Sequence, residues 1–228
     1  AFSSCSSLAS VGDLSACTSI GRSAFYSCYA LENIGDLPEC VAINERAFYN
    51  CSSLKSIGNL PKCEVIGDLA FLCDYYYKYI DGENKYIKAN SSLASIGNLP
   101  VCKTIGEKAF YDCGELTTIG DLLACESIKS EAFRSCDKLK SINLQVCTSI
   151  GDNAFNSCSA LTSVDLSNCT SIGNYAFYGC NSIKTITFSD KPATLEGIGS
   201  LGDFAMLRIP STALAAYQNA PIWSEPEL

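Results

Sequence analysis

The sequence predicts an α/β-type solenoid, with a parallel β-sheet on one face of the array and short helical or 3-10 turns on the other. Two observations lead to this prediction: a dipeptide that recurs at nearly constant spacing, and an alternation of apolar residues before each copy. The dipeptide is Ala-Phe, and its copies are 23, 23, 23, 39, 23, 22 and 22 residues apart in a chain of 228 residues. Such a period is typical of solenoids, in which each repeat buries its apolar side only against its neighbours. The copies begin at Ala1, Ala24, Ala47, Ala70, Ala109, Ala132, Ala154 and Ala176.

Each repeat is predicted to open with a short strand. In the most regular copy, Leu161, Val164 and Leu166 precede Cys169 and give the pattern L-x-x-V-x-L-x-x-C. Val164 and Leu166 alternate with polar residues, and a period of two indicates a strand with one buried face. In successive repeats these strands would stack in parallel, roughly 4.8 Å apart. The segment matches the L-x-x-L-x-L-x-x-N/C pattern of leucine-rich repeats.

Repeats of 23 residues carry one residue more than this strand pattern needs. The extra residue lies between the two apolar strand positions, where the pair is always Gly followed by Asp or Asn. One added residue would turn every later side chain to the opposite face, unless a bulge absorbs it. Glycine readily adopts the positive φ that such a bulge requires. We therefore predict five consecutive bulges, at Gly12, Gly35, Gly58, Gly97 and Gly120.

The second half of each repeat is predicted to form the outer face. The pair Ile-Gly would turn the chain away from the strand, and the following x-x-Ala-Phe-x-x-Cys is too short for more than a turn or two of helix. Ala allows close approach of the backbone, and Phe fills the centre of each coil. The phenylalanines should therefore form a continuous buried column.

The fifteen cysteines fall into two columns, and three explanations compete for them. The odd count and the repeat-dictated spacing disfavour a disulfide framework, and a metal site would need a close pair such as C-x-x-C, which the chain lacks. Small buried hydrophobes with weak donor capacity fit best, so most of the thiols are predicted to be unpaired. Cys73 is the fifteenth, and Asn90 takes the second-column position after the insertion. The first column is Cys17, Cys40, Cys63, Cys102, Cys125, Cys147 and Cys169; the second is Cys5, Cys28, Cys51, Cys113, Cys136, Cys158 and Cys180.

Composition disfavours catalysis and several classes of partner. The chain has no histidine, so a nucleophilic cysteine would lack its usual activating base. We predict no enzyme, no catalytic residue, no cofactor and no metal. The net charge of −8 disfavours nucleic acid and anionic membranes, and no apolar run approaches the length of a membrane span. A monomer is expected.

The repeat unit L-x-x-I-x-L-x-x-C-x-x-I-G-x-x-A-F-x-x-C resembles the BspA-like leucine-rich repeats of bacterial and protist surface proteins. The resemblance covers residues 1 to about 188, and the stretch from Leu207 to Trp223 looks like the cap that closes such arrays in bacterial members. It implies a secreted or surface-anchored protein that adheres to host matrix proteins, other cells or glycans, with no catalytic residue and no cofactor. The departures are the insertion after Cys73 and the density of cysteine. Because the chain opens in mid-repeat, we expect that upstream residues, including any signal peptide, have been removed.

The division expected from these features is a solenoid of about eight 22–23-residue repeats at 1–188, with a hairpin insertion at 74–89, and a C-terminal cap at 189–228. In the cap, Leu207 to Ile209 should add a last strand and Ser211 should cap a helix that Pro221 ends. Tyr217 and Trp223 would cover the open end of the core, because terminal coils of solenoids need such covers.

Two surfaces are candidates for partner binding. The insertion carries five of the twelve tyrosines and a basic character against an acidic body; the alternative is that its tyrosines fold down on adjacent coils. The exposed side of the strands carries a polar column, for which the alternative is a sheet surface kept polar for solubility. The insertion candidates are Tyr75, Tyr76, Tyr77, Tyr79, Tyr86, Lys78 and Lys85. The concave-face candidates are Asp13, Asp36, Asn59, Asn98, Asp121, Asn143 and Asp165.

The favoured function is a non-catalytic binding or adhesion module of a secreted or cell-surface protein that recognises a protein or glycan. The alternative is an intracellular or periplasmic scaffold for protein–protein contact. The presence or absence of a signal peptide at the full-length N-terminus would separate the two.

Overall fold

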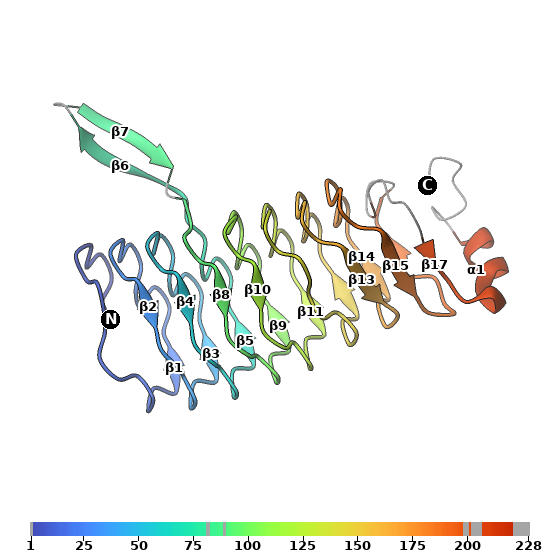
Figure 1. The fold of residues 1–228 in the computed structure, drawn as a ribbon, viewed down its shortest axis with the longest axis horizontal. Coiled ribbons are helices and arrows are strands. Elements are labelled where there is room, and N and C mark those ends of the chain that lie inside the picture. Colours follow the sequence, from blue (N-terminus) through green and yellow to red (C-terminus); the bar gives the residue numbers. More distant parts are fainter. Residues whose placement is uncertain (1, 81–82, 89, 198–200, 202–206, 221–228) are drawn as a thin grey trace.

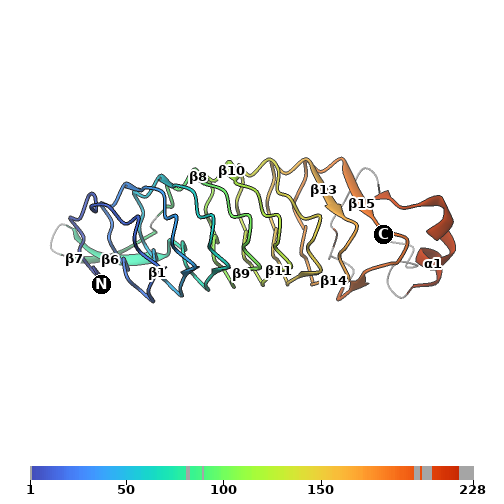
Figure 2. The same ribbon diagram turned by 90° about the horizontal axis from the view of Figure 1, so that it is seen from below.

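The predicted solenoid is confirmed. The computed structural model describes residues 2–80, 83–88, 90–197, 201 and 207–220. These residues form a row of coils stacked along one axis, with a short helix at the far end (Figures 1 and 2). The boundary between repeat array and cap at residue 188 stays a prediction, since strands of both sheets continue beyond it.

The longest sheet is not where the sequence pattern placed a strand. It is built from the residue pair that ends at the Ile of the Ile-Gly position, where Asn44 and Lys129 replace Gly in two coils and Leu195 replaces Ile in the last. The sequence assigned this position to a turn, so that part of the prediction was wrong. Each two-residue strand pairs in parallel with the equivalent strand of the next coil, as Ile128 does with Ile150. The inward Ile is buried while its predecessor is exposed or half-buried, so one apolar residue per coil suffices for this sheet. Its order is β1 (Ser19–Ile20), β3 (Ala42–Ile43), β5 (Val65–Ile66), β9 (Thr104–Ile105), β11 (Ser127–Ile128), β12 (Ser149–Ile150), β14 (Ser171–Ile172) and β16 (Thr194–Leu195).

The strands that the sequence predicted form two smaller parallel sheets. In two of the shorter repeats the strand keeps both apolar residues, and β13 pairs with β15 over four residues, Val164 opposite Ile186 and Leu166 opposite Phe188. Around Ile142 and Leu144, where the same alternation predicts a strand, none is formed. In the 23-residue repeats the strand is two residues long and ends at the Gly-Asx pair. The first sheet has the order β10 (Thr118–Ile119), β8 (Ser95–Ile96), β4 (Ser56–Ile57) and β2 (Asn33–Ile34); the second has β13 (Ser163–Leu166), β15 (Thr185–Phe188) and β17 (Leu207–Arg208).

The predicted glycine bulges are not formed. Among the described glycines only Gly179 has a positive φ, of 74°, and the five glycines named for bulges have none. Three of them are needed for another reason, the close approach of successive coils. A Cβ on Gly97 would lie 2.6 Å from the carbonyl carbon of Gly58, and one on Gly120 would lie 2.6 Å from the backbone nitrogen of Asn98. At Gly12 and Gly35 a Cβ would meet nothing within 4 Å.

Consecutive hydrogen-bonded turns form the outer side of the coils. The residue before Ala-Phe and the residue before the second-column Cys adopt positive φ, as at Ser23 (53°) and Ser27 (55°). Such a conformation costs a non-glycine residue about 1 kcal/mol or more, so the surrounding contacts must offset it. Main-chain bonds to the next coil do so: the N–H groups of Ser23, Phe25 and Ser27 donate to Glu45, Ala47 and Tyr49 at 2.8–3.0 Å. In the described part of the chain the helices are confined to the C-terminal end.

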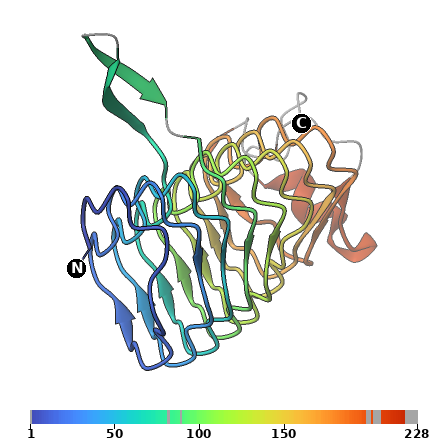
Figure 3. The same cartoon turned by 60° about the vertical axis from the view of Figure 1, so that its left-hand side comes forward.

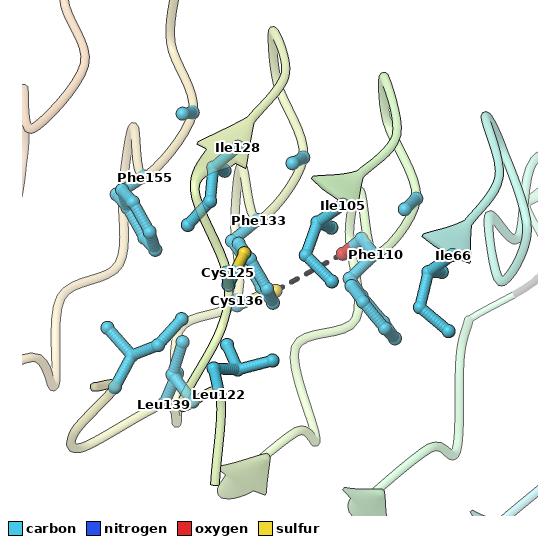
Figure 4. Packing of buried hydrophobic residues seen from close by; sticks show 14 of the residues in the cluster. Ile66, Ile105, Phe110, Leu122, Cys125, Ile128, Phe133, Cys136, Leu139 and Phe155 are labelled. Carbon is cyan, nitrogen blue, oxygen red and sulfur yellow. Dashed lines mark hydrogen bonds between the residues drawn. The ribbon is translucent and has the colours of Figure 1, made fainter. Parts of the chain in front are cut away.

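In the core, equivalent residues of successive coils stack in columns. Neighbouring phenylalanine rings stack with centroids 5.0–5.4 Å apart along the array, from Phe2 to Phe177. Figure 4 shows Phe110, Phe133 and Phe155 in this column, with Ile105 and Ile128 beside it. Every phenylalanine of this column except Phe2 is buried, and each ring has at least one stacked aromatic neighbour. Stacking of the rings stabilises the array beyond the burial of their apolar surface.

All fifteen cysteines are free thiols, and thirteen of them are buried, as the sequence predicted. Second-column thiols donate to the phenylalanine carbonyl of the preceding coil; Cys136 reaches Phe110 at 3.1 Å (Figure 4). First-column thiols donate to the carbonyl two residues on, as Cys63 does to Val65 at 3.3 Å. Cysteine is therefore used as a small apolar residue that also satisfies a buried carbonyl.

The C-terminal end follows the expectation in part. The last strand, β17, pairs with β15, and Tyr217 is buried against the end of the array with its hydroxyl donating to the carbonyls of Ser189 (3.1 Å) and Lys191 (3.2 Å). The helix begins as a 3-10 turn, η2 (Ser211–Ala213), and continues as α1 (Leu214–Asn219). The predicted helix N-cap, Ser211, is wrong: the N-cap residue is Pro210, and no side chain caps the helix there. Pro221 and Trp223 lie outside the described residues.

Candidate functional site

The insertion forms the predicted hairpin and stands away from the coils. Strands β6 (Tyr75–Ile80) and β7 (Glu83–Lys88) pair antiparallel, with Tyr77 opposite Tyr86 and Lys78 opposite Lys85. Figures 1 and 3 show the pair extending outward from the side of the array. Because residues alternate between the two faces of a strand, positions 75, 77, 79 and 86 share one face of this ribbon. The alternative that these tyrosines fold down on adjacent coils falls on side chains that lie outside the described part of the structure.

The hairpin leaves the array through Asp74, which is anchored to the preceding coil. Its backbone N–H donates to Oδ1 of Asn50 at 2.6 Å, and the hydroxyl of Tyr49 donates to Oδ2 of Asp74 at 3.1 Å. Burial, and then the nearby carboxylate of Asp74, raise the pKa of Tyr49, so this tyrosine remains a donor across the physiological range.

The coil that carries the insertion differs from the others at two outer positions. Cys73 is buried, whereas Asn90 is exposed. The expectation that Asn90 takes the second-column place was therefore wrong: on the two sides of the insertion it is Cys73 and Ser91 that are buried. The second difference is Leu72, which follows Phe71 where neighbouring coils have tyrosine.

A depression of about 560 Å³ lies at the base of the hairpin. Tyr49 and Tyr111, two coils apart, line it together with Leu72 from the coil between them. We call it the Tyr49–Tyr111 slot. The three coils that line the slot keep the usual spacing of the array, since the ring centroid of Phe71 lies 5.3 Å from that of Phe48 and 5.0 Å from that of Phe110. Where the column is filled by aromatic rings, as between Tyr26 and Tyr49, the rings stack 5.1 Å apart and within 5° of parallel.

Charged groups surround the slot. Lys108 pairs with Glu131 at 3.1 Å and with Glu107 at 3.4 Å, and Arg46 pairs with Glu45 at 3.2 Å. These contacts largely neutralise the two cations in the lining. Two further carboxylates, Asp74 and Asp112, also line the depression.

On the far side of Tyr111, the next coil supplies Arg134. Its guanidinium carbon lies 5.7 Å from the centroid of the Tyr111 ring, and it is held by Glu131 at 3.0 Å. The array thus already places a guanidinium against this tyrosine.

The slot was not found from the sequence, although a signal was present. When the repeats are aligned on Ala-Phe, the position after Phe reads Ser3, Tyr26, Tyr49, Leu72, Tyr111, Arg134, Asn156 and Tyr178. Leu72 is the one aliphatic residue in that column, directly beside the insertion. The significance of this exception depends on knowing that the column faces outward.

The polar column on the exposed side of the strands serves the stacking of coils. Oδ1 of Asp36 accepts the backbone N–H of Asn59 at 2.7 Å, and Oδ1 of Asn59 accepts that of Asn98 at 3.1 Å. Asn98 does the same for Asp121 at 3.2 Å. The end members Asp13, Asn143 and Asp165 instead accept the N–H two residues on, at Ser15, Gln145 and Ser167. Their oxygens therefore hold the backbone together, which gives the column a structural explanation.

Chemistry at the thiols is disfavoured by their surroundings. Burial raises the pKa of Cys102 and Cys147 to about 11 and that of Cys63 and Cys169 to about 12. These thiols therefore stay protonated, and a protonated thiol is a poor nucleophile and metal ligand. In the described ranges, no three His, Cys, Asp or Glu side chains gather as metal ligands would. Likewise, none of the described helices is long and apolar enough to cross a membrane.

Comparison with known proteins agrees with the geometry. The family described as BspA type leucine-rich repeat region matches residues 1–98 and 83–200, in six copies. The chain belongs to this family. Such proteins are generally non-catalytic, and their fold suits protein–protein interaction. No curated protein matches the chain.

Two solved structures share the fold of this BspA-type repeat protein. A leucine-rich repeat protein from Bacteroides ovatus is 26% identical, with a TM-score of 0.57 over 79% of this chain. The chain spans 46% of the length of that protein. A leucine-rich repeat protein of T. pallidum is 24% identical, with a TM-score of 0.53, covering 78% of this chain and 75% of that one.

Proposed function

We propose that this chain is a non-catalytic binding or adhesion module of a secreted or cell-surface protein, and that it recognises a protein or glycan through the hairpin of β6 and β7. The observation that carries the proposal is the hairpin itself. It interrupts a repeat that is otherwise explained by stacking, and it extends away from the coils. Tyrosine offers a large contact area and a polar tip at low entropic cost, which suits a binding surface.

The other columns of the molecule are accounted for by folding. Phenylalanine, isoleucine and cysteine side chains fill the core, and the Asp/Asn column bonds one coil to the next. Lysine and glutamate one repeat apart pair on the surface, as Lys55 does with Glu32 at 2.8 Å and Lys138 with Glu115 at 2.7 Å. The hairpin lies outside this repeat pattern, and its composition of tyrosine and lysine is what we propose to explain by binding.

Two considerations support the proposed location outside the cell. The repeat resembles those of bacterial and protist surface proteins. Dense cysteine would be hazardous in an oxidising environment if the thiols were accessible, but here thirteen of fifteen are buried. Their burial removes this objection to an extracellular location.

The test is binding of three purified proteins to glycan arrays, matrix-protein arrays and host cells. The first is the native chain. In the second, a short Gly-Ser linker replaces residues 75–89, which retains Asp74 and its contacts. The third carries Tyr175→Ser and Tyr178→Ser, which removes two exposed tyrosines at the far end of the outer side. We expect the linker variant to lose at least tenfold in affinity for any ligand found, and the double variant to bind as the native chain does.

Native-like binding by the linker variant would contradict the proposal and return attention to the column from Asp13 to Asp165. Light scattering on the same samples tests the expected monomer. A dimer that the linker variant no longer forms would mean that the hairpin mediates self-association instead.

A further inference from the structure

We propose that the outer edge of β6 binds an extended segment of a partner protein, which adds a third strand to the hairpin. The inference rests on the proposed function and deepens it, because it assigns the ligand to polypeptides rather than glycans. It also specifies the contact, which consists of main-chain hydrogen bonds along β6.

The hairpin is the one sheet of the described part that consists of two strands. The other sheets have eight, four and three strands, whereas β6 pairs only with β7. Both strands extend away from the coils, so in the residues that the structure describes each has an edge with no neighbouring strand (Figures 1 and 3). Such an edge presents a row of N–H and C=O groups that can pair with another chain, and a third strand stabilises a ribbon of two.

The register identifies the main-chain groups on the outer edge of β6. Ile80 pairs with Glu83, with two residues between them. Residues that flank a two-residue connection exchange hydrogen bonds, and bonded pairs then alternate with non-bonded pairs along the ribbon. Counting back from Ile80, every second residue of β6 is bonded to β7. The residues between them, Tyr75, Tyr77 and Tyr79, therefore direct their N–H and C=O groups away from β7, at a repeat of about 7 Å.

The two outer edges of the hairpin differ in composition. β6 contains four tyrosines, one isoleucine and a single charged residue, Lys78. β7 contains Glu83, Lys85 and Lys88 among its six residues. Aromatic and β-branched residues favour strand pairing, whereas charged residues, lysine above all, are the usual means by which an edge strand is kept from pairing. β6 is therefore the edge that accepts a further strand.

The chemistry of this edge selects a polypeptide. Donors and acceptors that recur together at the repeat of a strand are matched by the main chain of another strand, and strand addition to an open edge is a general mode of peptide recognition. A glycan offers hydroxyl groups, which lack this repeat of N–H and C=O groups. The main chain of β6 thus distinguishes between the two ligand classes of the proposed function.

Cross-strand pairing defines the partner segment further. β-branched or aromatic residues are favoured opposite Tyr75, Tyr77 and Tyr79, and an acidic residue is favoured opposite Lys78. The charge of the hairpin agrees with an acidic residue in the partner, since residues 75–88 carry three lysines against one aspartate and one glutamate in a chain whose net charge is −8. The partner segment is thus extended, with β-branched or aromatic residues at every second position and an acid between two of them.

The experiment is an NMR titration of the native chain with the capped hexapeptide Thr-Val-Glu-Val-Thr-Val. Paired antiparallel to β6, its valines lie opposite Tyr75, Tyr77 and Tyr79, and its glutamate lies opposite Lys78. A single short strand should bind with a Kd of order millimolar. We expect the amide signals of the three tyrosines to shift more than those of Tyr76 and Lys78, whose N–H groups are already bonded to β7.

N-methylation of the peptide separates main-chain pairing from side-chain contact. Methylation of the three valine amides keeps every side chain and removes the donors that face β6, so affinity should fall by at least about tenfold. The matched control is methylated at the two threonine amides and the glutamate amide, whose N–H groups face solvent. It should bind within about twofold of the parent peptide. Equal binding of the two methylated peptides would overturn the proposal, because contacts of side chains alone do not distinguish them.

Two proline variants test the location. Tyr77→Pro removes the central donor of the β6 edge, and Tyr86→Pro removes the equivalent donor of the β7 edge, since the two residues pair across the hairpin. Proline is tolerated on an edge strand where its N–H would face solvent, so both variants should disturb the hairpin to a similar extent. We expect Tyr77→Pro to weaken binding of the parent peptide by at least about tenfold and Tyr86→Pro to change it by less than about twofold.

The reverse order of the two proline variants would place the site on β7 and overturn the proposal. If either variant loses the hairpin, the methylated peptides decide with the native chain. Absence of any shift at Tyr75, Tyr77 and Tyr79 with the parent peptide also overturns the proposal. Shifts there that depend on the concentration of the native chain alone would show a second copy on β6, which contradicts the assignment to a partner protein.

Failure of this inference is distinguishable from failure of the proposed function. Hairpin-dependent binding of a glycan, with no response to the peptide, would support the proposed function and overturn strand addition. Native-like array binding by the linker variant would overturn the proposed function, and the peptide titration would still decide whether β6 accepts a strand.

Discussion

The coil that carries the insertion and the regular coils around it have the same interior and different exteriors. Phe71 stacks between Phe48 and Phe110 at the same spacing that Phe133 keeps to Phe110 and Phe155. Ile66 pairs with Ile43 and with Ile105 across the insertion without a shift in register. On the outside, by contrast, Leu72 replaces tyrosine and the chain departs after Asp74. Stacking therefore constrains the inside of every coil, and the outside can change wherever the chain leaves the array.

The largest expected effect on the free energy of unfolding comes from the buried thiols, which most of the coils share. Because burial raises the pKa of these thiols, the folded chain keeps protons that the unfolded chain loses above about pH 8.5. The unfolded state then binds fewer protons, so the free energy of unfolding falls as the pH rises. Each such thiol contributes about 1.4 kcal/mol per pH unit up to its folded-state pKa, about 11 for Cys102 and Cys147.

Denaturant unfolding at pH 7, 9 and 10 measures this loss, with reducing agent present throughout. Cys136→Ala should make the loss shallower, because it removes a fully buried thiol whose pKa burial raises. An unfolding free energy that is the same at all three pH values would contradict this account of the thiols.

Phenylalanine deletions compare the two kinds of coil directly. Phe133→Ala in a regular coil should cost about 3–5 kcal/mol of unfolding free energy, because it empties a site between two stacked rings. Phe71→Ala in the insertion-bearing coil should cost the same within about 1 kcal/mol, since its surroundings match. A much smaller cost at Phe71, measured by denaturant unfolding, would show that the insertion loosens the interior after all.

Glycine substitutions test how closely the coils approach on either side of the insertion. Gly97→Ala should destabilise by about 1–3 kcal/mol, because the new Cβ would meet the backbone of Gly58. Gly12→Ala is the matched control, as a Cβ there meets nothing within 4 Å. Equal thermal stability of the two variants would mean that neighbouring coils move apart at little cost.

The smallest effect on stability is expected from replacing residues 75–89 by a short linker. The hairpin is paired only with itself among the sheets, so its loss should change the free energy of unfolding by less than about 1 kcal/mol. A large loss in a denaturant titration would instead show that the hairpin braces the array.

Sequence reasoning recovered the features that depend on period and composition. The phenylalanine column, the buried free thiols, the hairpin and the parallel stacking all follow from spacing, because one repeat must meet the next in the same way each time. It placed the β13 and β15 strands correctly because Val164 and Leu166 show the alternation that defines a strand.

The sequence by itself thus determined that the chain stacks, and which residues lie inside. Only the tertiary structure decided how the backbone accommodates that stacking. A strand with one apolar residue, such as Ser127–Ile128, has no alternation to read, and it exists only because an identical pair lies beside it. The same holds for Gly97 and for the positive φ of Ser23 and Asp112, which are set by contacts with the neighbouring coil. The Tyr49–Tyr111 slot likewise arises from residues far apart in the chain, because coil stacking brings Tyr49, Leu72 and Tyr111 together across steps of 23 and 39 residues.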